Sequence, residues 1–316
     1  MTAAPTVVEI CAGGGGQALG LEQASFEHAA VAEIDPDACS TLRANRPGWK
    51  VIEGDIRDLD GRQFDGVDLV AGGVPCQPFS VGGMQLGAGD ERDVFPEALR
   101  LIREARPRAV MLENVPGLGQ KRFNDYRWQI VKRLDELGYK DLWWLVARAE
   151  QYGVPQRRHR LVLVTFRMHD DALRFSFPFG TNAYSGSVGR VLHDLMGARK
   201  WEGTYDWTLQ AAKLAPAIVG GSKKHGGPDL GPTRAREAWR KLGVNGGSIA
   251  EEAPGPDDPP DLVPRLTNRM VARIQGFPDG WQFSGRKTAA YRQIGNALPP
   301  PVARAFGESI AAALRG

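Results

Sequence analysis

The sequence predicts an α/β protein with a doubly wound, mostly parallel sheet and a second, smaller, irregular domain. Short β-rich runs alternate with helical patterns through the first part of the chain, which is typical of repeated β-α-β units. This alternation stops after about Phe175, where Gly, Ser, Pro and scattered Trp residues replace it. Repeated units of this kind build a parallel sheet whose binding sites lie beyond the carboxyl ends of the strands.

The elements of the first domain follow one another in a regular order. Residues 6–11 form a β-rich run, a glycine cluster follows, and residues 17–27 have helical periodicity. The other predicted strands cover 31–34, 51–53, 67–72, 109–113, 142–147 and 161–166. The other predicted helices of this domain cover 37–46, 95–106 and 126–137.

The end of the chain is predicted to return to the first domain. Residues 251–261 are rich in proline and acidic residues, which is typical of a linker. Residues 264–275 and 301–314 then have helical patterns. The last helix carries Val302, Phe306, Ile310 and Leu314 on one side, so we expect it to pack on the sheet. The expected division is therefore 1–175, then 176–261 as a separate lobe, then 262–316.

Composition and cysteine count set further limits. The 316 residues, 42% hydrophobic and 24% charged, suit one large core or two smaller ones. The sequence has no run of roughly 18 to 20 apolar residues and no secretion-signal pattern, so we expect a cytoplasmic protein. Cys11, Cys39 and Cys76 cannot all pair and lack metal-ligand spacing. Reduced thiols and no metal are therefore expected.

The net charge of +3 is small, but basic residues are unevenly distributed. Residues 121–160 contain ten Lys and Arg against five Asp and Glu, and residues 196–242 contain nine against four. Either cluster is compatible with an ordinary solvated surface. They indicate nucleic-acid binding only together with other evidence.

A glycine-rich turn between the first strand and the first helix indicates a ligand site. Residues 11–16 read Cys-Ala-Gly-Gly-Gly-Gly, and glycines let a ligand approach the backbone and the positive end of a helix. A turn without a ligand, or a dinucleotide site, fits this motif alone equally well. Glu33 ends the second strand and Asp55 follows the third. One carboxylate can bind ribose hydroxyls, while Ile34 and Ile56 can enclose an adenine, although both acids can also be ordinary caps.

Three further segments carry candidate chemistry. Cys76 lies in Gly-Gly-Val-Pro-Cys-Gln-Pro-Phe-Ser, a short loop that follows an apolar run, and residues 113–115 read Glu-Asn-Val after another. Residues 156–160 read Gln-Arg-Arg-His-Arg before a third apolar run. Taken singly, a cysteine is more often a small buried hydrophobe and a basic run a solvated strand end.

These segments, in this order, resemble the DNA cytosine-5 methyltransferases of bacteria and phages. The likeness continues near the end of the chain, where residues 273–278 read Arg-Ile-Gln-Gly-Phe-Pro and residues 291–299 read Tyr-Arg-Gln-Ile-Gly-Asn-Ala-Leu-Pro. Only about 175–261 has no match to general family motifs. Two departures are Cys11, in place of an aromatic residue that flanks the adenine, and Met270, where many members carry Glu.

The resemblance implies a Rossmann-like fold that binds S-adenosyl-L-methionine and releases S-adenosyl-L-homocysteine. The implied catalytic residues are Cys76 as nucleophile, Glu113 as partner of cytosine N3, and Arg158 and Arg160 as anchors of the base or phosphate. The implied cofactor residues are Cys11, Ala12, Gly13, Gly15, Gly16, Glu33, Ile34, Asp55, Ile56, Pro75 and Asn296. Cysteine addition at C6 makes C5 reactive, and neighbouring cations would help to ionise the thiol.

Double-stranded DNA is the expected partner, because the family flips its target cytosine out of the duplex. The irregular lobe, 176–261, is then expected to be the target-recognition domain. The predicted substrate-binding residues are Gln77, Ser80, Arg92, Gln156, Lys223, Lys224 and Arg234. We expect a monomer that is associated with the nucleoid and not with a membrane. A cognate restriction endonuclease is its expected companion.

Three rival interpretations remain at this level. A tRNA cytosine-5 methyltransferase would use the same scaffold and chemistry, but the sizeable basic lobe favours DNA. A catalytically silent DNA-binding relative is disfavoured by the presence of Cys76, Glu113 and Arg158. A nicotinamide-dependent oxidoreductase would explain the glycine turn and leave the cysteine loop without a role.

Overall fold

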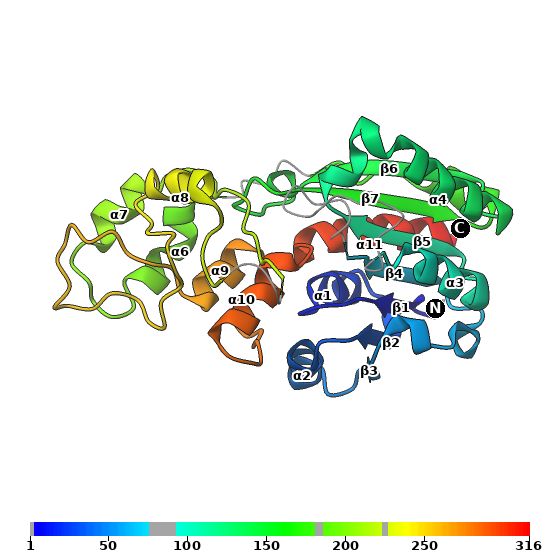
Figure 1. Cartoon of the computed structure of the whole chain (residues 1–316), viewed down its shortest axis with the longest axis horizontal. Helices are drawn as coiled ribbons and strands as arrows, with labels where there is room; N and C mark the ends of the chain where they lie inside the picture. Colours follow the sequence, from blue (N-terminus) through cyan, green and yellow to red (C-terminus); the bar gives the residue numbers. More distant parts are fainter. Residues whose placement is uncertain (1–2, 76–92, 181–185, 223–226) are drawn as a thin grey trace. The chain divides into compact units, whose positions relative to one another are not determined.

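The computed structural model describes residues 3–75, 93–180, 186–222 and 227–316 (Figure 1). The chain divides into two compact units. The first, called the sheet unit, comprises Met1–Ala147, His159–Pro178 and Val302–Gly316. The second, called the helical unit, comprises Arg148–Arg158 and Phe179–Pro301.

The sheet unit is built on a seven-stranded sheet in the order β3-β2-β1-β4-β5-β7-β6. Its strands are β1 Thr6–Ile10, β2 Glu27–Glu33, β3 Val51–Glu53, β4 Leu69–Gly73, β5 Ala109–Asn114, β6 Asp141–Arg148 and β7 His159–Phe166. The pairs from β3 to β5 are parallel, and β7 runs antiparallel to β5. The α/β class and the mostly parallel sheet are thus as predicted.

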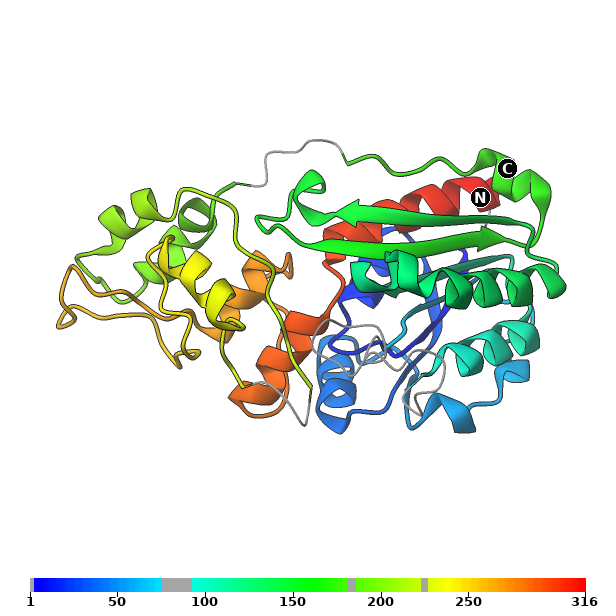
Figure 2. The ribbon, with the colours of Figure 1, turned by 45° about the horizontal axis from the view of Figure 1, so that its top comes forward.

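Helices cover both faces of this sheet. Their bounds are α1 Gly16–Gln23, α2 Pro36–Asn45, α3 Phe95–Ala105, α4 Asn124–Glu136, α5 His169–Arg174 and α11 Pro300–Arg315. Helices α3 and α4 lie on one face and α11 on the other (Figure 2). Side chains of α3 and α4 pack with strand residues such as Val110 and Leu112 in one large core. Short 3-10 turns join the elements at Ile56–Asp58, Gly61–Phe64, Pro116–Gly119, Lys121–Phe123 and Ala149–Gln151.

The terminal helix packs as its apolar pattern predicts. Val302, Phe306, Ile310 and Leu314 are all buried. A side chain at Gly307 would come within 2.7 Å of Ala24 Cβ, just after α1, so α11 and α1 approach closely on their shared face of the sheet.

The helical unit is less irregular than its sequence predicts. It contains α6 Val188–Met196, α7 Thr204–Gln210, α8 Thr233–Arg240, α9 Asn268–Ile274 and α10 Lys287–Asn296. The first three occupy the stretch with no clear periodicity, and α10 was not predicted. Trp201, Trp207 and Trp239 are buried and anchor this core. The indole groups of Trp201 and Trp207 donate to main-chain carbonyls, which fixes both side chains inside the unit.

The compact units differ from the division expected from the sequence. Residues 148–158 and 262–301 group with the helical unit rather than with the sheet. The physical reason is visible in isolated bridges, which pair Gln156 with Ala215 and Ala250 with Thr267. These segments pair with residues that are distant in the sequence, and a local sequence pattern cannot reveal such pairing.

Met270, one of the departures from the family pattern, stabilises the start of α9. Thr267 caps this helix by accepting a hydrogen bond from the Met270 amide at 3.3 Å, and the Thr267 amide lies 3.5 Å from the Met270 sulfur. The pair forms a capping box in which a buried thioether stands at the position that Glu or Gln usually fills. Its place in a helix cap supports a structural role for residue 270.

Within the described ranges, no helix combines the length and the apolar character needed to cross a membrane.

Candidate functional site

The carboxyl ends of the parallel strands in the sheet unit bring the candidate residues together. The chain runs outward from β1 through β2 to β3 and then returns to β4 on the other side of β1, which creates a switch point between β1 and β4. Doubly wound sheets bind ligands at this point. Gly72 is required here, because a side chain on it would lie 2.6 Å from the main-chain oxygen of Ile10.

Glu33 is fixed at this edge by main-chain donors. Its carboxylate accepts from the amide of Gly13 at 2.7 Å and from the amides of Ile34 and Asp35 at 2.9 and 2.8 Å. The side chain is almost fully buried. The glycine turn and the end of β2 therefore hold one another in place, and the carboxylate keeps lone pairs for a further donor.

The glycine turn itself has an unusual backbone. Cys11, Gly13 and Gly15 all have positive φ angles, of 53°, 55° and 85°. This conformation is uncommon for a residue with a side chain, so Cys11 is held there by its surroundings. Burial raises the pKa of the Cys11 thiol, the acidic residues around it add to this effect, and the residue is a free thiol in the structure. Ala12 and Gly16, the other predicted turn residues, are buried.

The residues predicted to enclose an adenine have different surroundings. Ile34 is 61% exposed beside the buried Glu33, whereas Ile56 is buried in the core. Asp55 caps the short turn that follows, accepting from the Arg57 amide at 2.9 Å and pairing with its guanidinium at 2.9 Å. An exposed isoleucine at this edge suits contact with a flat apolar ligand, while Asp55 also serves as the cap that its sequence position allowed.

The predicted cysteine loop begins beside Glu113. Gly73, at the end of β4, pairs with Glu113 in β5. The Asn114 amide donates to the main-chain oxygen of Val74 at 3.0 Å, which fixes the chain where it leaves the sheet. The sequence identified Asn114 only as part of the Glu-Asn-Val motif. Pro75 is exposed, and Cys76, Gln77, Ser80 and Arg92 lie outside the described residues.

Glu113 and Arg160 meet in a largely buried ion pair. Arg160 Nε lies 2.8 Å from Glu113 Oε1, and both side chains are mostly shielded from water. The antiparallel pairing of β7 with β5 brings these two residues together across the sheet. The pair fixes the orientation of the carboxylate next to the start of the cysteine loop.

Arg158 has a different environment from Arg160, although both were predicted to be catalytic. Arg158 is 1% exposed and belongs to the helical unit. Its guanidinium donates to the main-chain oxygens of Ile218, Gly295 and Ala297 at 2.7, 2.8 and 2.9 Å. Two of these oxygens lie at the end of α10, where a cation complements the helix dipole.

Gln156 is likewise an internal residue rather than an exposed substrate contact. It is fully buried, donates to the Gln275 side chain at 2.7 Å and accepts from the Ile218 amide at 2.9 Å. Gln275 in turn donates to Ala297 oxygen at 2.7 Å. Gln156, partly through Gln275, and Arg158 thus hold the same two segments, the chain near Ile218 and the end of α10. In this structure each of them positions other parts of the helical unit.

Asn296 is the last residue of α10 and bonds within the helical unit. Its amide donates to Gly221 oxygen at 3.1 Å. Gly220 and Gly295 cross here with almost no space, because a side chain on Gly295 would lie 2.6 Å from Gly220 Cα. The crossing fixes the start of the segment that leads to Lys223 and Lys224, which lie outside the described residues. The expected cofactor contact of Asn296 stays a prediction.

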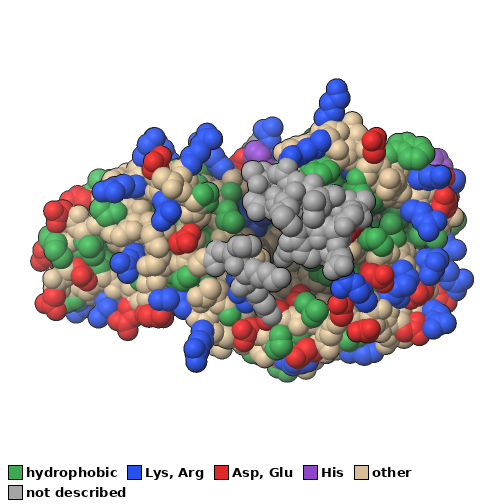
Figure 3. Space-filling model, in the orientation of Figure 1, with side chains coloured by type: hydrophobic (Ala, Val, Ile, Leu, Met, Phe, Trp, Pro, Cys, Tyr) green, Lys and Arg blue, Asp and Glu red, His purple; other side chains and the backbone are tan. Residues whose placement is uncertain are grey.

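Helix α8 presents a basic surface. Arg234, Arg236, Arg240 and Lys241 are exposed on or beside it, while Trp239 is buried beneath. None of the four cations forms an ion pair with a described residue. Figure 3 shows several Lys and Arg side chains on this face of the helical unit, where Figure 1 places α7 and α8. Such unpaired cations are available to bind phosphates.

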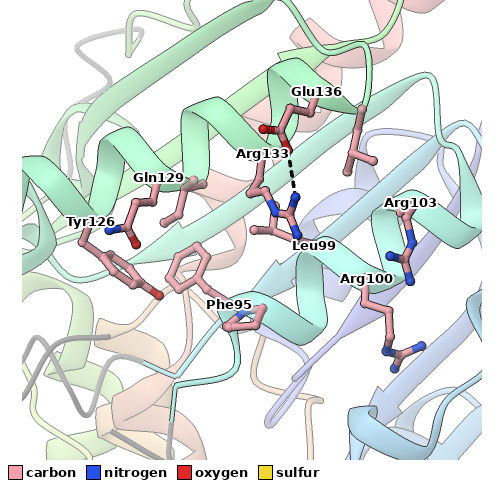
Figure 4. A pocket seen from close by; sticks show the side chains of 11 residues that line it. Phe95, Leu99, Arg100, Arg103, Tyr126, Gln129, Arg133 and Glu136 are labelled. Carbon is pink, nitrogen blue, oxygen red and sulfur yellow. Dashed lines mark hydrogen bonds and ion pairs between the residues drawn. The ribbon is translucent and has the colours of Figure 1, made fainter. Parts of the chain in front are cut away.

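A groove of about 270 Å³ lies between α3 and α4 (Figure 4). Phe95, Leu99, Tyr126, Arg103 and Arg133 are among its lining residues. Among the described residues, none that was predicted for catalysis, cofactor or substrate lines this groove.

A second buried polar pair, which the sequence patterns did not predict, lies on β1 and β2. Glu9, which precedes the glycine turn, lies 3.8 Å from His28 Nε2, and both side chains are completely buried. The imidazole stacks against Trp49 with ring centres 4.4 Å apart. Burial raises the pKa of Glu9, and the nearby imidazole partly opposes this shift.

The comparisons with known proteins agree with this geometry. Residues 5–312 match the family described as C-5 cytosine-specific DNA methylase. The chain is 53% identical over 312 residues to the Type II methyltransferase M.NaeI of Lentzea aerocolonigenes, covering 98% of this chain and 75% of that relative. It is 47% identical over 323 residues to the Type II methyltransferase M.NgoMIV of Neisseria gonorrhoeae, covering 98% of each.

Solved structures support the fold. A prophage-encoded DNA modification methyltransferase from E. coli has a TM-score of 0.68 at 21% identity, covering 99% of this chain and 100% of that one. A DNMT2 variant from Spodoptera frugiperda has a TM-score of 0.66 at 16% identity, covering 97% and 99%.

Arg158 and its neighbour Arg157 offer a matched pair for testing the positioning role. Arg158→Met removes three hydrogen bonds from a charged donor to buried oxygens, so we expect the free energy of unfolding to fall by roughly 3 kcal/mol. Arg157 is exposed, and Arg157→Met should change the free energy of unfolding by no more than about 0.5 kcal/mol. Urea unfolding measures both. An Arg158→Met variant as stable as the parent protein would contradict the positioning role.

Glu9 should make stability depend on pH. Because its pKa is raised above 4.5 in the folded protein, the folded state holds this proton more tightly and loses stability as pH rises through the raised value. Glu9→Gln carries no charge, so its stability relative to the parent should increase as pH rises through this range. Unfolding curves from pH 4 to 8, with the exposed Glu27→Gln as control, measure this. A stability difference between Glu9→Gln and the parent that stays constant across that range would refute the raised pKa of Glu9.

Proposed function

Because the chain belongs to the C-5 cytosine-specific DNA methylase family and is a DNA cytosine-5 methyltransferase, we propose a covalent mechanism for it. It transfers a methyl group from S-adenosyl-L-methionine to C5 of a cytosine flipped out of a specific duplex sequence, through an adduct of Cys76 at C6. The observation that carries this proposal is the Glu113–Arg160 pair, 2.8 Å apart beside the start of the cysteine loop.

The cofactor site is proposed at the carboxyl ends of β1, β2 and β3. S-adenosyl-L-methionine, when bound, supplies a methyl group that a nucleophilic carbon can accept. Glu33 accepts three main-chain hydrogen bonds and keeps acceptor capacity for one further donor such as a ribose hydroxyl, and the Gly13 amide fixes its orientation. The exposed Ile34 offers an apolar surface to the adenine. The donor set therefore fits this molecule, which has a ribose and no phosphate.

Cys76 is proposed to attack C6 of the flipped cytosine. The new sulfur–carbon bond moves electron density to C5, which then takes the methyl group. Transfer of the C5 proton to water then breaks the bond between C6 and sulfur, which restores the ring and releases the thiolate. Glu113, in its protonated form, donates a hydrogen bond to N3 during the addition, and Arg160 holds the carboxyl group in the required orientation. Asn114 fixes Val74, two residues before the nucleophile.

The helical unit is proposed to hold the duplex. Flipping costs a few kcal/mol, which contacts to the remaining DNA must offset. The exposed cations of α8, including the predicted Arg234, supply phosphate contacts. We propose that residues 176–261 form the target-recognition segment. The catalytic part comprises residues 1–175 and continues in residues 262–316. Gln156 and Arg158 support this segment from within.

Further partners follow from the relatives. M.NaeI and M.NgoMIV are Type II methyltransferases, which favours a restriction-modification setting and DNA rather than tRNA as substrate. We propose a cognate restriction endonuclease as companion, action as a monomer on one base at a time, and work at the nucleoid.

The nucleophile can be tested by substitution. Cys76→Ser should reduce methyl transfer by roughly 10³-fold or more, because a hydroxyl does not replace the thiolate. Binding of S-adenosyl-L-homocysteine should persist. Cys39→Ser, a buried thiol that donates to a main-chain oxygen, is the control and should stay active. The parent protein should also be trapped covalently by a duplex with 5-fluorocytosine in its target sequence. Full activity of Cys76→Ser would rule out the covalent route.

The phosphate contacts can be tested by salt dependence. DNA affinity should fall steeply with added salt, and Arg234→Gln together with Arg236→Gln should reduce the slope of log K against log salt by about 2. Arg304→Gln, on α11 and paired with Glu308, is the control and should leave the slope unchanged. Titrations of a labelled duplex at several salt concentrations measure this. An unaltered slope in the double variant would remove α8 from the DNA interface.

A further inference from the structure

Asp93, the first described residue after 76–92, is fixed by a side chain from α4. The hydroxyl of Tyr126, in the first turn of α4, donates a hydrogen bond to Asp93 Oδ2 at 2.6 Å. Asp93 Oδ1 accepts from the Phe95 amide at 3.0 Å, at the start of α3. One carboxylate therefore joins the chain that follows the Cys76 segment to two helices.

Tyr126 is itself held in place as a donor. Its ring meets the buried ring of Phe95 edge to face, with ring centres 6.0 Å apart, and Figure 4 shows Tyr126 reaching from α4 toward the start of α3. Burial and the Asp93 carboxylate raise the pKa of Tyr126, so the hydroxyl keeps the proton that it donates. A hydrogen bond from a hydroxyl to a carboxylate is among the stronger ones in proteins.

The chain before Cys76 is held from the same stretch of sequence. Asn114, the last residue of β5, donates to Val74 oxygen at 3.0 Å. Residues 114–126, which begin directly after Glu113, therefore hold the chain on both sides of 75–92. A segment held at both ends has fewer conformations than one held at one end, so less entropy is lost when one of its residues takes up a single geometry.

We propose that Tyr126 is a positioning residue for methyl transfer, which acts through Asp93 on the placement of Cys76; this role rests on the proposed covalent mechanism. Tyr126 touches neither the base nor the cofactor. Without its hydroxyl, Cys76 and cytosine C6 are aligned in a smaller fraction of the bound complexes. The chemical step therefore slows while both ligands still bind.

Tyr126→Phe removes only the hydroxyl and tests this role in the full chain. In single turnovers, well below the melting temperature, methyl transfer and covalent trapping by a 5-fluorocytosine duplex should each slow by about 10-fold, since one hydrogen bond to a charged group is lost. The dissociation constants for duplex DNA and for S-adenosyl-L-homocysteine should stay within about twofold of the parent values. A purely structural role would lower the melting temperature and leave both rates unchanged.

Two changes at Asp93 test the same contact from its other side. Asp93→Ser keeps an oxygen that can cap α3 but is too short to reach Tyr126, so it should slow the same two steps as Tyr126→Phe. Asp93→Asn keeps an oxygen for the Phe95 amide and an amide group for the phenol oxygen, so it should retain most of the parent rate. An Asp93→Ser variant as fast as the parent would contradict the proposal even if Tyr126→Phe failed to fold.

Tyr139→Phe is the matched control. Tyr139 lies in the core of the same unit, and its hydroxyl donates to Pro107 oxygen at 2.7 Å. This variant should lose stability as Tyr126→Phe does, but both rates should stay within about twofold of the parent. Tyr126→Phe rates equal to those of Tyr139→Phe, whether both are fast or both are slow, would overturn the assignment of Tyr126. A parent protein that methylates DNA but is never trapped would instead refute the covalent mechanism, and this assignment with it.

Discussion

The parallel register of β1, β2, β4 and β5 is the constraint on which the rest of the site depends. Parallel strands end at the same edge, so residues far apart in the chain become neighbours there. Pairing of Gly73 with Glu113 brings the entrance of the cysteine loop to the carboxylate. Antiparallel β7 then adds Arg160 from the other side. A shift of one residue in either pairing would turn these side chains to the opposite face.

Two arginines separated by one residue show how burial decides a role. Arg160 pairs with a carboxylate at the sheet edge, whereas Arg158 is enclosed by main-chain oxygens. A guanidinium has five donors in a fixed plane, so it can join several segments at once. Arg158 does this for the end of α10 and the chain near Ile218, with Gln156 bonding to the same region. The helical unit is thus organised around a buried polar network as well as an apolar core.

The region of the glycine turn contains buried polar groups that stability alone does not favour. Glu9 and His28 are enclosed at a separation longer than a hydrogen bond, and neither end of the Gln17 amide has a partner in the described part of the chain. Cys11 adds a strained backbone at the same turn. Proteins depart from local rules in this way at sites where a ligand or a reaction requires it. Their concentration around one turn supports a binding site there more strongly than the glycines alone.

The sequence by itself determined the α/β class, the order of the candidate site motifs along the chain and the buried face of the last helix. These features follow from local periodicity and from short motifs. It also placed Glu33, Glu113 and Arg160 at strand ends, where the structure has them. Only the tertiary structure decided that Arg158 and Gln156 face inward, that the tryptophans of the helical unit form its core, and that Met270 caps α9. Burial and pairing of this kind depend on partners between about 60 and 140 residues away, such as Ile218 and Gly295 for Arg158. Local sequence carries no record of such distant partners, because contacts form only after the whole chain has folded.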